Sequence, residues 1–373
     1  MKPKTLVLII GLLLSTLASA AMHFEKNQKC SECHPKIYEE YKTSQHGNAT
    51  VFQDKIHGAV FDKHPMKKME KYRCGKCHTP TADNLKELLT PNNGVLPDPE
   101  NETQNEAIAC AYCHRITDVK PGKAMNEHVV SKDMRKYFAN LESNVTSPFH
   151  EIETNVEVFK NGKLCMGCHM HKTNKQGFEV CSTEDNNMDG NNNCITCHMP
   201  QVDGAPSTLS NVKKHAFHGF PGIHGDLSLL SKYVTLHFQH TEKNFTLSVD
   251  HQATHSSTLH PLRMAKLMVS IERNGEVIKM DPKKLFKVIG TKEGDKSKPT
   301  PPWLATDIIQ DTRIPANTKK DYDYDFTLQS GDKVTAKFGY LLVKPKALEK
   351  FGLENNAEAK EFRVIAKETF TVK

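Results

Sequence analysis

Cys30-Ser31-Glu32-Cys33-His34 is the first of five copies of one pattern: two cysteines three positions apart, followed at once by a histidine. The others occupy residues 74–78, 110–114, 165–169 and 194–198, and we number them motif one to motif five in chain order. Two thiols at this spacing can add across the vinyl groups of a haem, and the histidine can then bind the iron. The copies therefore predict five covalently attached haem c groups. The expected haem-binding residues are Cys30, Cys33, His34, Cys74, Cys77, His78, Cys110, Cys113, His114, Cys165, Cys168, His169, Cys194, Cys197 and His198.

Structural zinc sites are the main alternative for clustered cysteines and histidines. A zinc ion needs four ligands drawn from spaced pairs, so it gives no reason for a histidine to follow the second cysteine in every copy. Ten of the eleven cysteines belong to the motifs, which argues against a disulfide framework. The remaining thiol, Cys181, is expected to be buried and unpaired, or to form an intermolecular disulfide.

The first twenty residues have the features of a secretory signal peptide. Lys2 and Lys4 precede an apolar run over residues 5–17, and Ala18-Ser19-Ala20 fits a small-residue cleavage site. A retained N-terminal anchor is the alternative. No later run approaches the length of a membrane span, so we expect a chain exported to the periplasm or the cell exterior, without a membrane-spanning helix after cleavage.

The formal net charge of +6 changes once the haems are counted. Cleavage after residue 20 removes Lys2 and Lys4 and leaves +4. A ferric haem with two ionised propionates carries about one negative charge, so five of them bring the total to about −1. The basic composition therefore indicates compensation for propionates and not a nucleic-acid surface. A basic surface that recruits an acidic partner is the alternative.

Every motif lies within residues 22–222, which we expect to form a pentahaem cytochrome domain. At about 35 residues per haem, the chain is too short to build an apolar core around each one, so the haems themselves must fill the interior. Ile37, Tyr38 and Tyr41 share one helical face, which predicts a helix that ends near Ser44. Residues 132–141 are also expected to be helical.

Residues 225–373 contain no motif and show the alternating pattern of β-strands. Asn274-Gly275 between two apolar runs is typical of a two-residue hairpin turn. The pattern predicts an antiparallel β-sandwich, so the expected fold class is α + β, with a helical and irregular multihaem domain followed by a sandwich. The expected strands include residues 234–238, 245–249, 262–272, 276–280, 322–328, 333–343 and 362–372.

Fifteen histidines remain once the motif histidines are set aside. A second imidazole on an iron gives a bis-histidine haem, which is low-spin in both oxidation states and transfers electrons with little rearrangement. Methionines beside the motifs are poorly placed, because the sixth ligand approaches from the opposite face. The expected distal ligands are His46, His57, His150, His218 and His255, with His64, His128 and His224 as competitors.

The run from Cys30 to His46 resembles the opening of multihaem cytochromes in the hydroxylamine-oxidoreductase superfamily, which includes tetrahaem electron carriers. Residues 108–116, 147–150 and 194–200 continue the resemblance. It implies that residues 218–224 lead the haem domain into a β-sandwich, to which residues 253–263 and 311–315 are similar.

A polar loop before motif five partly matches a calcium-binding loop. Asp185, Asn187 and Asp189 stand at its first three ligand positions, but Thr196 stands where the bidentate glutamate belongs. A weak calcium site that braces the motif-five haem is one interpretation, and an asparagine-rich surface loop is the other.

The function we favour is that of an exported pentahaem electron carrier without substrate chemistry. Its expected partners are redox proteins such as a quinol-linked dehydrogenase, other cytochromes or a terminal reductase, and oligomers are compatible with this role. A reductase or oxidase of small nitrogen or sulfur compounds with one open haem is the enzymatic alternative. All five motifs end in histidine, so the lysine-ligated haem of some reductases is absent. A subunit of an extracellular cytochrome filament is a third possibility.

Overall fold

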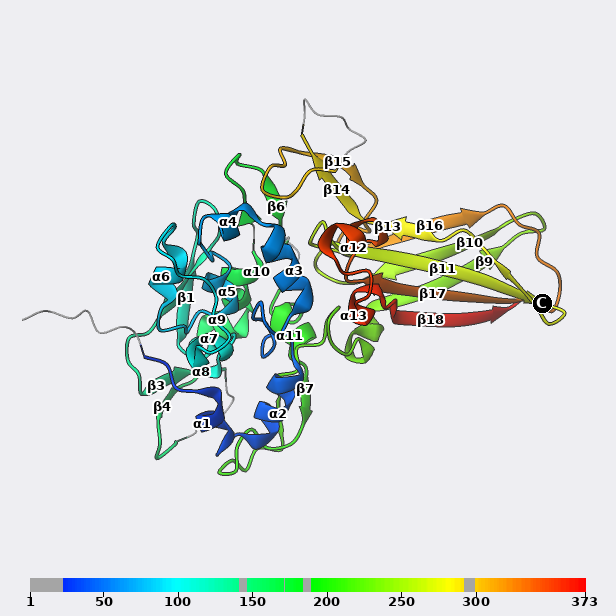
Figure 1. The fold of residues 1–373 in the computed structure, drawn as a ribbon. Helices are drawn as coiled ribbons and strands as arrows, with labels where there is room; N and C mark the ends of the chain where they lie inside the picture. Colours follow the sequence, from blue (N-terminus) through cyan, green and yellow to red (C-terminus); the bar gives the residue numbers. More distant parts are fainter. Residues whose placement is uncertain (1–22, 141–145, 171, 184–188, 292–298) are drawn as a thin grey trace, which may run out of the picture.

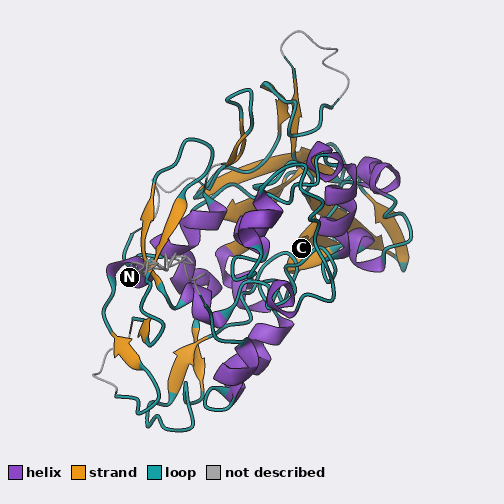
Figure 2. Cartoon of the chain, turned by 60° about the vertical axis from the view of Figure 1, so that its left-hand side comes forward, coloured by secondary structure: helices purple, strands orange, loops and turns teal. Residues whose placement is uncertain are grey.

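The computed structural model describes residues 23–140, 146–170, 172–183, 189–291 and 299–373. Figure 1 shows short helices gathered on one side of the molecule and long strands on the other. Figure 2 shows that loops connect most of the helices. Helices and antiparallel sheets are both present, in agreement with the expected α + β class. No helix among the described residues is long and apolar enough to span a membrane.

The motif-bearing region is built from helices of one to three turns. Motif two to motif five each contain a single helical turn, which brings the two cysteines to one side of the backbone. The helix predicted after motif one is confirmed as α2, which Pro35 begins at a position that suits proline. The helices are α1 (Asn27–Ser31), α2 (Pro35–Thr43), α3 (Lys55–Lys63), α4 (Pro65–Lys68), α5 (Gly75–His78), α6 (Leu85–Leu89), α7 (Glu102–Asn105), α8 (Cys110–Cys113), α9 (Glu157–Lys160), η1 (Lys163–Cys165), α10 (Met166–His169) and α11 (Cys194–His198).

Small two-stranded sheets connect these helices. They are β1 (Ile116–Lys120) with β2 (Glu127–Val130), β3 (Lys136–Phe138) with β4 (Glu151–Glu153), β5 (Lys172–Thr173) with β6 (Glu179–Cys181), and β7 (Gln201–Asp203) with β8 (Lys214–Ala216). The helix expected over residues 132–141 is wrong, because strand β3 lies there. Phe138 donates its N–H to the His114 carbonyl and accepts from His114 Nδ1, so contacts with motif three hold the segment extended.

The second region contains two larger antiparallel sheets and the two-stranded antiparallel pair β14–β15. The first has the order β16-β10-β9, and the second has the order β12-β11-β17-β18 with β13 also paired to β11. Both contribute to one hydrophobic core, in which Phe245, Leu247 and Val249 of the first sheet meet Leu267 and Phe338 of the second. The strands are β9 (Val234–His240), β10 (Phe245–His251), β11 (Met264–Arg273), β12 (Glu276–Lys279), β13 (Lys283–Leu285), β14 (Lys287–Gly290), β15 (Asp307–Asp311), β16 (Thr318–Tyr324), β17 (Lys333–Leu341) and β18 (Arg363–Thr371); η2 (Ser228–Tyr233), α12 (Pro345–Phe351) and α13 (Ala357–Lys360) accompany them.

The hairpin predicted at Asn274-Gly275 is confirmed, and both residues have the positive φ angles, 52° and 82°, of a tight hairpin turn. The strand expected over residues 322–328 instead ends at Tyr324. From there the chain crosses to the other sheet, so β16 and β17 are not hydrogen-bonded neighbours. Phe326 and Leu328 still pack against the core, which explains why the alternation continues past the end of the strand.

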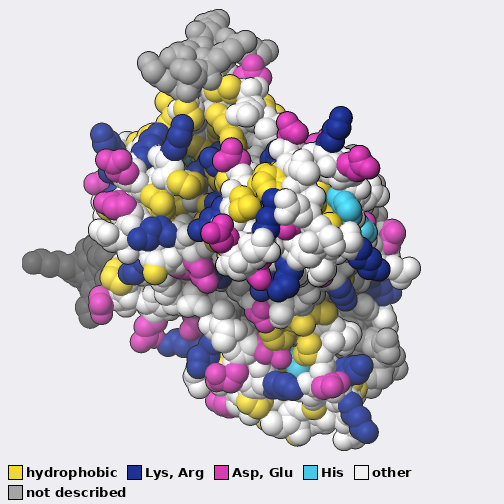
Figure 3. All heavy atoms as spheres, turned by 90° about the vertical axis from the view of Figure 1, so that its right-hand side faces the viewer, with side chains coloured by type: hydrophobic (Ala, Val, Ile, Leu, Met, Phe, Trp, Pro, Cys, Tyr) yellow, Lys and Arg dark blue, Asp and Glu magenta, His cyan; other side chains and the backbone are white. Residues whose placement is uncertain are grey.

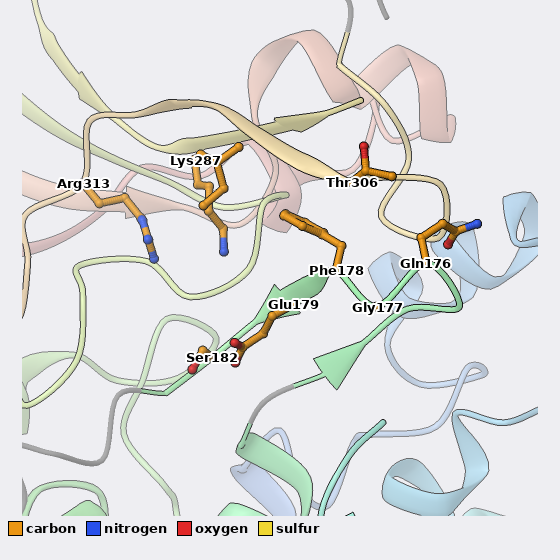
Figure 4. Close-up of a pocket in the computed structure, with 9 residues that line it drawn as sticks. Gln176, Gly177, Phe178, Glu179, Ser182, Lys287, Thr306 and Arg313 are labelled. Carbon is orange, nitrogen blue, oxygen red and sulfur yellow. The ribbon is translucent and has the colours of Figure 1, made fainter. Parts of the chain in front are cut away.

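The two regions meet along an extended contact. Ile56 of α3 packs with Leu342 and Leu353 in a small apolar cluster. The ring of Trp303, in the β14–β15 connection, lies 4.6 Å from the ring of His64. Farther along the junction a pocket of about 520 Å³ opens between the β5–β6 hairpin and the β14–β15 hairpin (Figure 4). Lys287 and Glu179 are among the residues that line this pocket, and no motif histidine does.

Candidate haem-binding site

Cysteines of different motifs lie beside one another in the interior of the first region. The Cys30 thiol lies close enough to that of Cys110 for each to shift the pKa of the other, which places motif one beside motif three. The same contact joins motif two to motif four through Cys77 and Cys168, and motif four to motif five through Cys165 and Cys194. Cys113 of motif three lies within electrostatic range of both motif-four cysteines. The attachment points are therefore contiguous. Motif one lies beside motif three, motif three lies near motif four, and motifs two and five each lie beside motif four.

Four motif histidines each face a second histidine from elsewhere in the chain. An iron between two imidazoles, with metal–nitrogen bonds of about 2 Å, separates the two ring centres by about 6 Å. The observed separations are 6.4, 6.0, 6.2 and 6.3 Å. They belong to the pairs His34–His150, His46–His169, His114–His218 and His198–His255, respectively.

Backbone carbonyls fix the rings of most of these histidines. A carbonyl oxygen only accepts, so the Nδ1 that contacts it carries the proton, and Nε2 keeps its lone pair for a metal. The Nδ1–carbonyl distance is 2.6 Å from His34 to Pro206, 2.9 Å from His114 to Phe138 and 2.6 Å from His198 to Pro221. Among the distal residues the partners are Ala216 for His218 at 2.6 Å, Ser256 for His255 at 2.9 Å and Glu151 for His150 at 3.4 Å.

Burial also favours the neutral form, which a metal requires, for most of these imidazoles. Burial lowers the pKa of His46 to about 4 and the pKa values of His169 and His218 to about 3, because desolvation disfavours the charged ring. Desolvation is also the leading cause of the lowered pKa values of His57, His78, His114, His150, His198 and His255.

The histidines at motif two have a different geometry. The rings of His57 and His78 are only 4.0 Å apart, too close for an iron between them. Both Nδ1 atoms contact the same carbonyl, that of Ala49, at 3.1 and 2.8 Å. His57 Nε2 and the Tyr72 hydroxyl are buried without a hydrogen-bond partner. The structure therefore brings His57 to motif two without placing it across from His78.

The competing histidines use their ring nitrogens in other contacts. His64 Nδ1 accepts from the N–H of Met66. His128 Nε2, the atom that usually binds haem iron, lies 2.8 Å from the Leu164 carbonyl. His224 Nε2 accepts from Arg263 at 2.8 Å. None of these three faces a motif histidine in the way the four pairs do.

No pattern in the sequence indicates the groups that orient the histidines. Most of them are backbone carbonyls, which every residue has, so only the fold selects Pro206, Pro221 or Phe138. The side chain of Glu40 also orients histidines, and no sequence motif indicates this role. Its carboxylate accepts from His215 Nε2 at 2.9 Å and from the backbone N–H of His218 at 3.0 Å.

The calcium prediction falls mostly outside the described residues, since these exclude Asp185 and Asn187. Asp189 accepts from the N–H groups of Asn191 and Asn192, both at 2.8 Å. No group of three or more histidine, cysteine, aspartate or glutamate side chains in the described part of the chain is arranged to hold a metal ion. Cys181 is a free thiol on β6, and burial raises its pKa.

Comparison with known proteins points in the same direction as the motifs. Residues 29–115 match the family model described as cytochrome c554 and c-prime. Among solved structures, a penta-heme cytochrome c552 from Thermochromatium tepidum is similar, with 21% identity and a TM-score of 0.71 over 94% of this chain and 100% of that chain. At this identity the likeness shows a shared fold.

A beta-glucosidase from Kluyveromyces marxianus matches at 10% identity and a TM-score of 0.18, over 38% of this chain and 15% of that one, which is too weak to indicate a shared fold. No protein with a curated description matches the chain. The five motifs, the family match and the shared fold together support a multihaem c-type cytochrome with covalently bound haem c and a role in electron transport.

Proposed function

We propose that this protein is an exported pentahaem electron carrier in which bis-histidine haems pass electrons between redox partners. The observation that carries the proposal is the set of four histidine pairs at the spacing of a shared iron. Haem fits these residues because paired imidazoles stand beside the cysteines that would hold its vinyl groups. Bound there, haem would supply one-electron redox chemistry, and two imidazole ligands would keep its rearrangement small.

The neighbouring cysteines support a continuous route for electrons. Contacts from Cys30 to Cys110, and from Cys165 to Cys194, would bring the edges of successive haems close together. In the proposed order, electrons pass along motifs one, three, four and five, and motif two is a branch beside motif four.

The second region has a role in this proposal beyond support. We interpret residues 22–222 as the pentahaem domain and residues 225–373 as a β-sandwich domain, as in the hydroxylamine-oxidoreductase superfamily. His255 lies between β10 and β11, and its ring is 6.3 Å from that of His198. The sandwich would thus supply the distal ligand of the motif-five haem. Export and exchange with other redox proteins complete the proposal.

The spin state of the oxidised protein tests the carrier role. Electron paramagnetic resonance should find low-spin, bis-histidine iron at the haems of motifs one, three, four and five, because two imidazoles impose a strong ligand field. High-spin signals from two or more haems would contradict the carrier proposal, since paired imidazoles leave no weak-field iron.

A second candidate function rests on the geometry at motif two. His57 and His78 contact the same carbonyl with their rings 4.0 Å apart, which favours a haem whose distal position stays open. An open position on this haem would suit a small nitrogen or sulfur compound, and the unpartnered His57 Nε2 and Tyr72 hydroxyl are the candidate proton-transfer groups near motif two.

The replacement of His57 by alanine tests whether His57 is a distal ligand or a proton-transfer group beside an open haem. If His57 is not a ligand, the variant keeps the wild-type number of low-spin haems, and cyanide converts about one haem in five from high-spin to low-spin in both proteins. His46→Ala is the matched variant, and it should turn one low-spin haem into a high-spin haem. Loss of a low-spin haem in the His57 variant would instead make His57 a distal ligand and would remove the open site.

A further inference from the structure

One outward face of the second region carries unpaired lysines. In the sheet formed by β12, β13, β11, β17 and β18, the residues that alternate with the core positions point away from the other sheet. Glu272 is the one acidic residue at these outward positions, and Lys333 pairs with it at 3.1 Å. The other cations there form no ion pair within the described part of the chain, and together they define what we call the lysine face: Lys266, Lys279, Lys284, Lys337 and Lys367.

Two pairs of these lysines stand directly opposite each other on neighbouring strands. Lys266 on β11 is opposite Lys284 on β13, and Lys337 on β17 is opposite Lys367 on β18. Side chains at such positions are neighbours, so like charges there repel each other and destabilise the sheet. The fold does not relieve this repulsion with an acidic side chain, which indicates that the lysines serve a function outside the domain.

The acidic residues of the neighbouring positions do not neutralise the lysine face. Glu276 and Glu368 occupy the inward alternation of β12 and β18, and Asp281 follows β12 at the edge of the sheet. At the end of the molecule viewed in Figure 3, by comparison, basic and acidic side chains are interspersed. The outward face of the other sheet has the opposite charge balance, with one lysine and three aspartates: Lys319, Asp250, Asp321 and Asp323.

An apolar pocket of about 320 Å³ adjoins the lysine face. Met268, Leu348 and Phe362 are among the apolar residues that line it, and no residue of a haem motif does. Lys266 and Lys360 also line the pocket, and the Lys266 ammonium lies 5.6 Å from the centre of the Phe362 ring. Apolar walls with two cations beside them suit an acyl chain that carries an anionic headgroup.

A layer of anionic lipid headgroups matches these features better than a folded partner does. Protein interfaces set their register with charges of both signs, whereas a lipid surface presents phosphates of one sign. Clusters of about four to eight basic residues are typical of sites that bind anionic lipids. The net charge of the whole protein would not cause such binding, because it falls from +6 to about −1 after signal cleavage and the addition of five haems.

We propose that the lysine face is a peripheral binding site for a membrane of anionic phospholipids, and that the pocket beside Lys266 and Lys360 receives part of one acyl chain. This inference goes beyond electron transfer and does not depend on it, because every residue involved lies in the second region. Bound in this way, the sandwich would hold the motif-bearing region at a membrane surface.

Sedimentation of the haem-loaded protein with lipid vesicles tests the lysine face. Vesicles of equal parts phosphatidylglycerol and phosphatidylcholine should bind the wild-type protein at low salt, and vesicles of phosphatidylcholine alone should not. Lys284→Gln/Lys337→Gln should weaken this binding about thirtyfold, and added salt should weaken the binding of the wild type. Lys243→Gln/Lys319→Gln removes the same charge from exposed positions of the other sheet and its turn, and should bind as the wild type does.

The stability of the Lys284/Lys337 variant distinguishes lost binding from lost structure. The variant removes one lysine from each opposed pair, so repulsion within the sheet decreases. Its free energy of unfolding in urea should therefore equal or exceed that of the wild type, while its affinity for anionic vesicles falls.

Two further variants separate the pocket from the rest of the lysine face. Met268→Asp and Val277→Asp each place a carboxylate at an exposed, outward position of the sheet, but only Met268 lines the pocket. Met268→Asp should weaken vesicle binding at least about tenfold more than Val277→Asp, because an unpaired charge in an apolar pocket opposes entry of an acyl chain. Equal effects of the two variants would overturn the role of the pocket.

Other outcomes would overturn the membrane site itself. These are a failure of the wild type to bind phosphatidylglycerol vesicles, equal binding to phosphatidylcholine alone, or an equal loss in Lys243→Gln/Lys319→Gln. Self-association of the wild type in sedimentation velocity that Lys284→Gln/Lys337→Gln abolishes would assign the face to a second copy of the chain. The low-spin haem signals of each variant are measured separately, so none of these results bears on the carrier proposal.

Discussion

His255 depends on its immediate neighbours for its position. Ser256, Ser257 and Thr258 are buried polar residues that follow it. Ser257 donates its N–H to the Ile314 carbonyl at 2.9 Å and accepts from the Ile314 N–H through Oγ at 3.1 Å. These reciprocal hydrogen bonds hold the loop against the segment after β15, and His255 Nε2 is left free to face His198.

The replacement of His255 by alanine tests this position. If His255 closes the motif-five site, His255→Ala should convert about one haem in five from low-spin to high-spin, because one imidazole ligand is lost. Magnetic circular dichroism would count the low-spin haems. His240→Ala, on the exposed end of β9, is the control and should leave the spectrum unchanged. An unchanged spectrum in both variants would remove His255 from the ligand set.

At the scale of elements, Asp332 organises the turn that leads into β17. Its side chain is 1% exposed and accepts from Arg273 at 2.9 and 2.7 Å and from the Gln329 N–H at 2.8 Å. The hydrogen bond from Arg273 holds the pKa of Asp332 below its ordinary value. A lowered folded-state pKa means that the stabilisation is present at neutral pH and is lost as the pH falls through that pKa.

Asp332→Asn should therefore lower the free energy of unfolding at pH 7 by about 1–3 kcal/mol, since a charge-assisted pair is broken. The difference from wild type should shrink as the pH drops below about 4. Urea unfolding followed by the circular dichroism of the sheets measures both effects. Asp281→Asn, at an exposed position, serves as the control. A difference that stays constant with pH would show that ionisation of Asp332 is not what stabilises the turn.

Across the whole molecule, the proposed order of haems makes motif four the junction. Its cysteines contact motif two through Cys168 and motif five through Cys165, and they lie near Cys113 of motif three. The wild-type chain should take up five electrons in a reductive titration, one for each motif. Fewer than five would contradict the predicted haem content.

Loss of a branch and loss of the junction should then have different effects. Cys74→Ser/Cys77→Ser removes the motif-two attachment and should leave electron transfer among the other four haems at the wild-type rate. Cys165→Ser/Cys168→Ser removes motif four and should slow transfer to the motif-five haem strongly, because its nearest neighbour is gone. Flash-photolysis kinetics on variants of measured haem content would check both. Similar slowing in the two variants would contradict the branched order.

The sequence by itself determined the attachment chemistry. Cys-x-x-Cys-His specifies a cofactor through covalent spacing, which is local and independent of the fold. Local patterns also predicted α2, the Asn274-Gly275 hairpin and most strands of the second region, because helical and strand periodicity are properties of short segments. The prediction for residues 132–141 was wrong for the opposite reason, since hydrogen bonds between Phe138 and His114 override local preference.

Only the tertiary structure decided which histidines meet. His46 and His169 are far apart in the chain, as are His198 and His255, and no local pattern relates them. Backbone carbonyls fix one ring nitrogen of His198 and of His255, and burial lowers the pKa of all four rings; both are properties of the folded chain. The different geometry of His57 and His78 at motif two arises in the same way, from the one Ala49 carbonyl that both rings contact.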